Sequence, residues 1–570
     1  MTSKRRFELL VSLYGEQTAE LAGARIDALM EGFRLQSGVI SRMAGRSVSH
    51  TDAFLITYGD QVQEPGVPPL KCLADFCTDH LTNTITAVHV LPFYPYSSDD
   101  GFSVIDYRKV DPMLGTWEDV ARLGSNFKLM SDAVLNHVSA QQEWFQHFLS
   151  DDPRYKDYFI VVEADSDLSQ VVRPRTLPLL TEFPARTGQK LVWTTFSEDQ
   201  VDLNFRNPDV LLEMLDVMLF YVLRGAAFLR LDAVAYLWKE IGTPCIHLPQ
   251  THAIIKLFRA VLDQVAPHVI LITETNVPHA ENISYFGNGT DEAQMVYNFA
   301  LPPLLLHTLH TSSSHALSRW ASSLKLPSER ATFFNFLASH DGIGINPVRG
   351  ILDQSEIEAI VRQCVLHGSL VSHRRNPDGT DTPYELNINY FDALSDPYSA
   401  EAPDLQVDRF IAAHAILLSL IGVPALYFHS LFGSRSWIDG PAQTGRNRTI
   451  NRQKLIRQNV EQELANPGSM RFKVFTRLRK LLQVRAQHPA FDPYGAQEVL
   501  EFGESVFALI RSSPSASERI LYLQNITSVP QTVILSEPHR GVDLLNQARR
   551  ISSGTLQLYP YEGLWVQLEA

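Results

Sequence analysis

The hydrophobic pattern of this chain alternates between short apolar runs and longer stretches with apolar residues at every third or fourth position. The runs are rich in β-branched and aromatic residues, as strands are, and lie at 53–58, 85–92, 127–135, 228–236, 269–273, 333–338 and 424–429. The helical stretches lie at 70–81, 207–224, 251–266, 314–324 and 404–421. Because a further unit over 294–306 continues the alternation, the pattern predicts an α/β fold, a TIM barrel of eight parallel (β/α) units.

Three segments interrupt or extend the predicted barrel. Residues 138–206 are too long for a loop between a strand and a helix, so we expect an inserted subdomain after strand 3. The long polar segment 342–400 follows strand 7 and is expected to form a lid. Short β-rich runs predict a small antiparallel C-terminal domain over 486–570. The catalytic barrel is expected to comprise 51–137 and 207–485.

The first part of the chain, 1–50, has apolar positions at three- and four-residue steps and predicts a helical N-terminal extension. We expect it to pack on the barrel as a cap, and a partner-binding helix is the alternative. The apolar positions are Leu9, Leu10, Leu13, Tyr14, Leu21, Ile26, Leu29, Met30 and Phe33.

Charge and composition limit the classes of function. The formal net charge is −14 over 570 residues, with both signs mixed along the chain, which argues against a nucleic-acid-binding surface. No apolar run approaches the roughly 20 residues that a membrane helix needs, and the N-terminus lacks the pattern of a signal peptide. We therefore expect a cytoplasmic protein, either a monomer or a homodimer.

The cysteines and histidines do not predict a metal site. No CxxC pair or Cys/His cluster occurs, so buried free thiols are expected, and three histidines near residue 310 lack the spacing of metal ligands. We expect neither a metal nor a cofactor. The residues concerned are Cys72, Cys77, Cys245, Cys364, His307, His310 and His315.

The apolar run 228–236 carries two charged residues, Arg230 and Asp232. Residues two apart on a strand point to the same face, and a cation close by keeps a carboxylate ionised. An ionised, positioned carboxylate is what a glycosidic nucleophile must be. An ordinary buried salt bridge is the alternative interpretation of this pair.

Other predicted strands also lead into polar residues. In a parallel barrel the catalytic groups lie at the carboxyl ends of the strands, so four such strands describe a catalytic rim. The polar residues at three of these ends are Asp132, Asn136, His137, Glu274, His340 and Asp341.

Taken in order, Asp132-Ala-Val-Leu-Asn-His, Arg230-Leu-Asp, Glu274 and His340-Asp resemble the four signature regions of the α-amylase family of retaining glycosidases and transglycosylases. The resemblance covers about residues 50–490 and is closest to the sucrose phosphorylase branch. It implies a catalytic nucleophile at Asp232, a general acid/base at Glu274 and a transition-state-stabilising carboxylate at Asp341. Asp132 and Asn136 are expected to support the architecture of the site.

The resemblance also implies a phosphorylase that takes small glucosides, with inorganic phosphate as a substrate and α-D-glucose 1-phosphate as the product. Arg230 is expected to hold the nucleophile ionised, and Glu274 to keep its proton to higher pH. Arg175, in a proline-rigidified Arg-Pro-Arg, is expected to reach toward phosphate. Asp99 is expected to pair with Arg448 and to close the pocket behind a single glucosyl unit. The substrate-binding residues implied are Asp99, Phe102, His137, Phe196, Gln200, Arg230, His340, Arg448 and Arg175.

The acceptor side differs from sucrose phosphorylase proper, which has His where this chain has Asn276 and Gln where it has Glu385. These residues, with Tyr384, resemble glucosylglycerate phosphorylase, so glucosylglycerate is the expected donor. The alternatives are sucrose 6'-phosphate, sucrose or glucosylglycerol phosphorylase, an α-glucosidase and a non-catalytic carbohydrate-binding relative. The arginines expected to offer charge to a glycerate carboxylate are Arg374, Arg375, Arg435 and Arg446.

Overall fold

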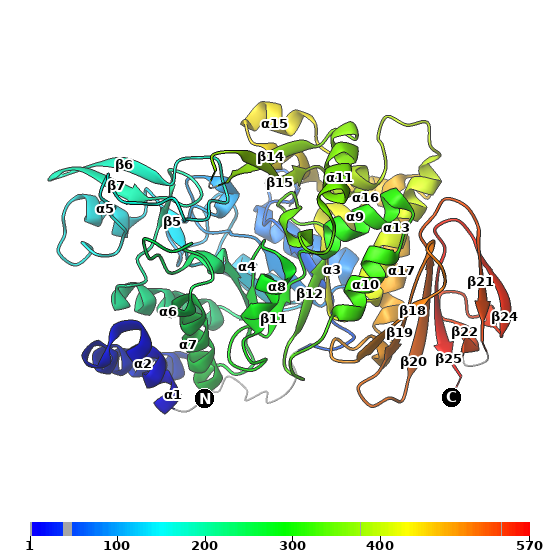
Figure 1. The fold of residues 1–570 in the computed structure, drawn as a ribbon, viewed down its shortest axis with the longest axis horizontal. Helices are drawn as coiled ribbons and strands as arrows, with labels where there is room; N and C mark the ends of the chain where they lie inside the picture. Colours follow the sequence, from blue (N-terminus) through cyan, green and yellow to red (C-terminus); the bar gives the residue numbers. More distant parts are fainter. Residues whose placement is uncertain (1–2, 38–47, 377, 537–538, 570) are drawn as a thin grey trace.

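Eight parallel strands close into a barrel at the centre of the molecule (Figure 1). The structure is a computed structural model, and it describes residues 3–37, 48–376, 378–536 and 539–569. Around the barrel the strand order is β1-β16-β12-β11-β10-β9-β4-β3, which confirms the predicted TIM barrel. The strands are β1 Phe54–Thr57, β3 Ala87–Val90, β4 Lys128–Val134, β9 Ala226–Asp232, β10 Ile270–Thr273, β11 Met295–Tyr297, β12 Thr332–Phe336 and β16 Val423–Tyr427.

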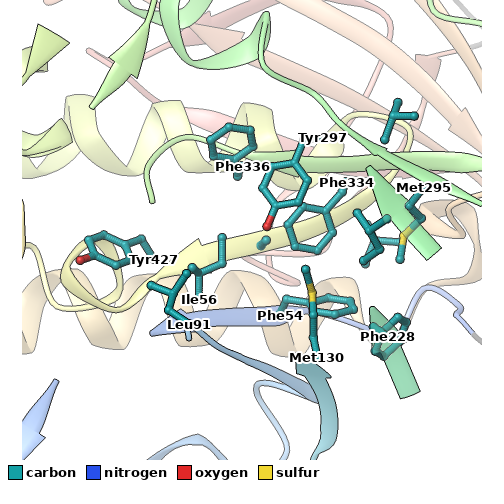
Figure 2. Close-up of a cluster of buried hydrophobic side chains, with 14 of the residues drawn as sticks. Phe54, Ile56, Leu91, Met130, Phe228, Met295, Tyr297, Phe334, Phe336 and Tyr427 are labelled. Atoms are coloured by element: carbon teal, nitrogen blue, oxygen red, sulfur yellow. The ribbon is translucent and has the colours of Figure 1, made fainter. Parts of the chain in front are cut away.

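Aromatic side chains fill the inside of the barrel (Figure 2). The ring of Phe54 on β1 lies edge-on to Phe228 and Phe334, with centroids 4.8 and 5.0 Å apart. Because β1 neighbours neither β9 nor β12 in the sheet, these contacts cross the barrel interior. All three rings are buried, and each stabilises the fold by about 1.5–3 kcal/mol relative to an exposed ring.

Helices that follow the strands begin near the predicted positions, and five of them have proline in their first turn. Proline suits this position because its missing N–H would have had no partner within the helix. Among the helices of eight or more residues are α3 Pro69–Leu81, α4 Trp117–Gly124, α6 Pro208–Leu223, α7 Pro249–Val265, α9 Leu301–Thr311, α10 His315–Ser323, α13 Pro403–Ser419, α16 Arg457–Leu464 and α17 Met470–Arg485.

Two N-terminal helices, α1 Ser3–Tyr14 and α2 Glu16–Ser37, pack against α6 and α7. Their apolar positions are largely buried, as predicted, but Leu21 is 67% exposed. The prediction was wrong there because Leu21 lies off the stripe that carries Ile26 and Met30. Residues 38–47 of the predicted extension lie outside the described residues.

The segment after β4 contains two antiparallel pairs, β5 with β8 and the hairpin of β6 and β7, which extends to the left in Figure 1. Its elements are β5 His137–Ser139, α5 Glu143–Leu149, β6 Leu180–Ala185, β7 Gly188–Trp193 and β8 Gln200–Asp202.

The segment after β12, which the sequence predicts as a long loop, forms a three-stranded sheet in the order β13-β15-β14. We call this sheet the lid. Most of β14 is partly exposed, so it lacks the apolar alternation that marks a half-buried strand. The elements here are β13 Ile343–Gly344, η4 Asn346–Val348, α11 Gln354–Leu366, β14 Leu370–Arg375, β15 Asp381–Asn387 and α12 Tyr390–Leu394.

A six-stranded antiparallel sheet and a separate strand pair form the C-terminal part, at the right of Figure 1. Arg511 of this sheet donates to the carbonyl oxygens of Ser419 and Asp492, at 3.2 and 2.7 Å, and so ties the sheet to the barrel. The strands are β18 Ala496–Glu501, β19 Val506–Ser512, β20 Arg519–Asn525, β21 Gln531–Leu535, β22 Gly541–Asp543, β23 Arg550–Ile551, β24 Gly554–Leu558 and β25 Gly563–Leu568.

Short elements complete the chain. They are β2 Val62–Gln63 paired with β17 Leu455–Ile456, α8 His279–Asn282, α14 Phe428–Leu431, α15 Asp439–Thr444 and the 3-10 turns η1 Asp99–Gly101, η2 Val234–Tyr236, η3 Ile283–Phe286, η5 Asn447–Asn451 and η6 Pro489–Phe491.

The four cysteines are buried free thiols, as predicted. Across the described residues no helix combines the length and apolar character needed to cross a membrane. Nor do three or more His, Cys, Asp or Glu side chains gather in the described part of the chain as they would around a metal ion.

Candidate active site

The carboxyl ends of the barrel strands surround a pocket with about 650 Å³ of space free of protein atoms. The pocket brings together most of the residues that the sequence singled out. They are Asp99, Phe102, His137, Arg175, Phe196, Gln200, Asp232, Glu274, Asn276, His340, Asp341, Tyr384 and Arg448.

Arg230 does not line this pocket, which corrects its prediction as a substrate-binding residue. Its side chain is 2% exposed and lies behind Asp232, to which Nη1 donates at 2.8 Å. On its other side the same nitrogen donates to Asp132, which also accepts from His89 at 2.7 Å. The two charges of the run 228–236 are therefore a buried ion pair as well as part of the site.

Asp132 and Asn136, which the sequence predicts to support the site, lie behind the pocket and contact charged side chains there. Burial acts to raise the pKa of Asp132, but His89 and Arg230 outweigh it and lower that pKa to about 2. Asn136 accepts from Lys239 Nζ at 2.6 Å and donates to Asp202 at 2.9 Å.

Asp232 ends β9, and Glu274 directly follows the neighbouring strand β10. Burial raises the pKa of Asp232 well above its usual range, against the pull of Arg230, and the charge of Glu274 raises it further. Burial likewise raises the pKa of Glu274. Burial and the second carboxyl therefore oppose Arg230, which is expected to keep Asp232 ionised.

Contacts nevertheless distinguish the two carboxyls. Asp232 accepts directly from Arg230, whereas the nearest guanidinium nitrogen lies 3.9 Å from Glu274. Coupled carboxyls titrate as a pair, and a shared proton resides on the group with the weaker cation contact. This arrangement favours a charged Asp232 beside a protonated Glu274.

Ala233 joins the two carboxyls through its backbone. It adopts the left-handed conformation, with φ of 47°, and its N–H donates to Glu274 Oε2 at 3.1 Å. A non-glycine residue in this region costs about 1–3 kcal/mol, and such residues cluster at functional sites. The sharp turn after Asp232 thus directs a donor at the neighbouring carboxyl.

Aromatic and polar residues line the pocket beside the two carboxyls. The Phe102 ring stacks on His340 with centroids 4.8 Å apart, and Phe196 packs near His137 at 5.2 Å. Burial lowers the pKa of both histidines, so each imidazole is neutral. Neutral rings, carboxylates and apolar faces together suit an uncharged sugar.

Arg448 does not form the predicted ion pair with Asp99. Its guanidinium pairs with Asp341 at 2.5 Å and with Glu385 at 2.6 Å, and Asp99 accepts instead from Gln200 Nε2 at 3.2 Å. Glu385 is 1% exposed and lies behind Arg448 rather than in the pocket. Its prediction as a substrate-binding residue is corrected accordingly.

Arg175, Tyr384 and Asn276 also line the pocket. The Arg175 guanidinium carbon lies 5.8 Å from the centre of the Tyr384 ring, and no carboxylate lies within ion-pair distance of Arg175 among the residues described. Asn276 Oδ1 is buried without a hydrogen-bond partner there. The Arg175 guanidinium and Asn276 Oδ1 are therefore both available to bind a polar ligand.

Sequence reasoning gave Tyr236 no role, yet it is partly buried, lines the pocket and packs its ring 5.5 Å from Phe196. It lies four residues beyond Asp232, in the turn η2, although the apolar run 228–236 predicts that the strand continues through it. The left-handed Ala233 ends β9 early and directs Tyr236 into the pocket.

Two of the arginines expected to meet a glycerate carboxylate already form ion pairs with neighbouring aspartates. Arg375 pairs with Asp381 at 2.7 Å and Arg435 with Asp392 at 2.8 Å. Arg446 lies in a larger outer hollow that shares Arg175 with the inner pocket. Of the arginines that the sequence offered for an anion, Arg175 is therefore the best placed.

Residues 81–342 match the family model described as the catalytic domain of alpha amylase. Over 533 residues the chain is 52% identical to a glucosylglycerate phosphorylase from Spirochaeta thermophila, a match that covers 93% of this chain and 90% of that protein. The chain belongs to the α-amylase family. The resemblance carried by the four signature segments is thereby confirmed.

Within the α-amylase family the chain falls in the sucrose phosphorylase-like branch. It is 45% identical over 537 residues to a glucosylglycerate phosphorylase from Escherichia coli, covering 94% of this chain and 95% of that protein. Its fold matches the crystal structure of a sucrose 6F-phosphate phosphorylase from Thermoanaerobacter thermosaccharolyticum with a TM-score of 0.73, at 25% identity and covering 85% and 96% of the two chains.

Proposed function

We propose that this chain is a glucosylglycerate phosphorylase, a glycosyltransferase that moves a glucosyl group from glucosylglycerate to inorganic phosphate and releases α-D-glucose 1-phosphate. The observation that carries the proposal is the 52% identity, over nearly the whole chain, to a protein of that name. The pocket supports it, because Asp232 is suited to act as the nucleophile and Glu274 as the acid. Arg175 lines the same pocket and forms no ion pair among the described residues.

In the first step, Glu274 donates its proton to the glycosidic oxygen while an Asp232 oxygen attacks the anomeric carbon. The bond from that carbon to the glycerate oxygen breaks, and a glucosyl ester of Asp232 forms as glycerate leaves with the proton. Asp341 accepts hydrogen bonds from the sugar hydroxyls, and the apolar face of Phe102 packs against the ring.

In the second step, the Glu274 carboxylate takes a proton from phosphate, whose oxygen attacks the anomeric carbon from the side that glycerate left. The ester bond to Asp232 breaks, and the product keeps the α configuration because two inversions have occurred. Arg175 binds the phosphate through its guanidinium fork. Two carboxyls supply this chemistry, and the mechanism uses neither a metal nor a cofactor.

A sugar-phosphate donor is the second candidate. It is favoured by the structural match to a sucrose 6F-phosphate phosphorylase, and Arg175 and Arg446 in the outer hollow would suit a second phosphate group. The two candidates share the donor glucosyl site and differ only in the leaving group.

The test is phosphate-dependent release of glucose 1-phosphate from glucosylglycerate, sucrose 6'-phosphate, glucosylglycerol and sucrose in parallel. We expect glucosylglycerate to give the highest kcat/KM, by about tenfold or more, since an interface built for a carboxylate discriminates against analogues without it. Preferential use of sucrose 6'-phosphate would replace the proposal with the second candidate. Glucose release that does not depend on phosphate would contradict both.

A further inference from the structure

Two arginines at the catalytic end of the barrel are held in the same way. Arg230 lies between a pocket carboxylate, Asp232, and a rear carboxylate, Asp132. Arg448 lies between the pocket carboxylate Asp341 and Glu385. Each guanidinium thus holds one carboxylate toward the sugar and is itself held from behind by another.

The contact between Glu385 and Arg448 is bidentate. Arg448 donates from Nε to Oε1 at 2.9 Å and from Nη2 to Oε2 at 2.6 Å, while its remaining nitrogen, Nη1, lies 2.5 Å from Asp341. A fork of two parallel hydrogen bonds fixes the plane of a guanidinium as well as its position. With Nε and Nη2 taken, the direction of Nη1 toward Asp341 is set.

The lid supplies Glu385 and makes room for it. Glu385 lies on β15, opposite Gly344 of β13, and is 1% exposed. A Cβ on Gly342, the residue after Asp341, would lie 2.6 Å from Glu385 Cγ. Any larger side chain at 342 would therefore displace the carboxylate that holds Arg448.

We propose that Glu385 is a positioning residue that acts through Arg448, orienting it so that Asp341 is fixed against the donor sugar and offsetting its charge. The inference rests on the proposed function in so far as that function assigns Asp341 to the sugar. Glu385 touches no substrate, and its contribution disappears when Arg448 is absent.

The ion pair between Glu385 and Arg448 also affects the pKa of Glu274. Arg448 lowers the pKa of Glu274, in opposition to burial. Neutralising Glu385 leaves the positive charge of Arg448 less balanced, so the pKa of Glu274 falls and the general acid is lost at a lower pH. A residue that merely packed the lid would not shift this titration.

The test is a double-mutant cycle of Glu385→Gln, Arg448→Gln and both together, with fluoride release from α-glucosyl fluoride as the readout. This donor requires only attack by Asp232 and departure of fluoride, so the cycle does not depend on which acceptor the enzyme uses. Asp381→Asn is the matched control, since it removes a carboxylate from the same strand that pairs with Arg375 on the lid surface.

We expect Glu385→Gln to lower kcat/KM about 10- to 100-fold in the wild-type background and to have little further effect in Arg448→Gln, whereas Asp381→Asn leaves it unchanged. Equal losses in both backgrounds, or no loss in either, would overturn the proposal. If Glu385→Gln does not fold, the cycle is closed with Glu385→Asp, which keeps the charge and shortens the reach.

With the glucoside donor, the alkaline limb of kcat/KM should move to lower pH in Glu385→Gln and return in Glu385→Asp. If the alkaline limb of kcat/KM did not move in Glu385→Gln, the proposed electrostatic effect of Glu385 on Glu274 would be contradicted. If no glucoside is phosphorolysed, the proposed function fails while the fluoride cycle still decides the role of Glu385.

Discussion

Asp232 and Glu274 are both buried, and their roles are separated by their contacts alone. Asp232→Asn keeps the shape of the side chain and removes its negative charge, so we expect kcat to fall by about four orders of magnitude or more. Steady-state release of glucose 1-phosphate measures this. Asp543→Asn, which alters another buried carboxyl in the C-terminal sheet, is the control with normal activity. More than a hundredth of wild-type activity in Asp232→Asn would contradict the assignment.

Glu274 must be protonated when the glucoside is cleaved. Burial raises its pKa, so activity should persist above the usual range of a glutamate and be lost as the pH rises through the folded-state pKa. A pH profile of kcat/KM on the glucoside checks this.

Replacing the acid itself separates its role from that of the nucleophile. In Glu274→Gln we expect cleavage of the glucoside to fall about 100- to 10,000-fold and the alkaline limb to disappear. Cleavage of α-glucosyl fluoride should fall far less, because fluoride leaves without a proton. Equal losses on both donors would show that Glu274 is not the general acid.

Strand-end carboxylates could be predicted because a polar residue stands out in an apolar run, and Asp232, Glu274 and Asp341 do lie together in the pocket. Arg230 and Glu385 were expected in the pocket, yet they lie behind it. Sequence shows that a charge is present but not which of two carboxylates an arginine will face. That choice depends on side-chain directions set by the closed barrel and the lid.

At the scale of elements, the lid contacts the pocket residue Asn276 through Gly344 of β13. A Cβ on Gly344 would lie 2.5 Å from Asn276 Oδ1, and the residue does not require a left-handed backbone. Gly344→Ala should therefore displace Asn276 without disturbing the barrel.

We expect Gly344→Ala to lower kcat/KM for phosphorolysis of the glucoside about tenfold and to leave cleavage of α-glucosyl fluoride within about twofold. Parallel assays on the two donors measure this. Gly32→Ala, in open space on α2, is the control with no effect. A parallel loss on both donors would show that Gly344 serves the donor site or the fold instead.

The barrel elements could be predicted because their strands are apolar and buried on both faces, whereas β14 of the lid is largely polar and partly exposed. The lid sheet is held by β-pairing between residues far from any apolar pattern, such as Arg374 with Thr382. Its existence therefore depends on hydrogen bonds that the pattern of side chains does not record.

For the molecule as a whole, Arg485 joins parts that are distant in sequence. It donates to the carbonyl oxygens of His50, Leu418 and Phe491 at 2.7, 3.1 and 3.1 Å. These contacts link the start of the barrel to the C-terminal part at the face away from the pocket, where barrel residues serve stability.

Arg485→Met should leave those buried carbonyls without partners and lower the free energy of unfolding by about 3 kcal/mol or more, with kcat/KM at 25 °C unchanged. Thermal melting monitors the loss. Arg479→Met, on the same helix and exposed, should melt like the wild type. An unchanged melting temperature in Arg485→Met would show that the link is dispensable.

The central claim is retaining phosphorolysis of glucosylglycerate by a double displacement. The most direct measurement is proton NMR of the first product formed from glucosylglycerate and phosphate, before any mutarotation of free sugar. The account predicts glucose 1-phosphate with an α anomeric proton, formed in step with the release of glycerate. A β anomer would contradict the covalent intermediate on Asp232, and free glucose as the first product would contradict phosphorolysis.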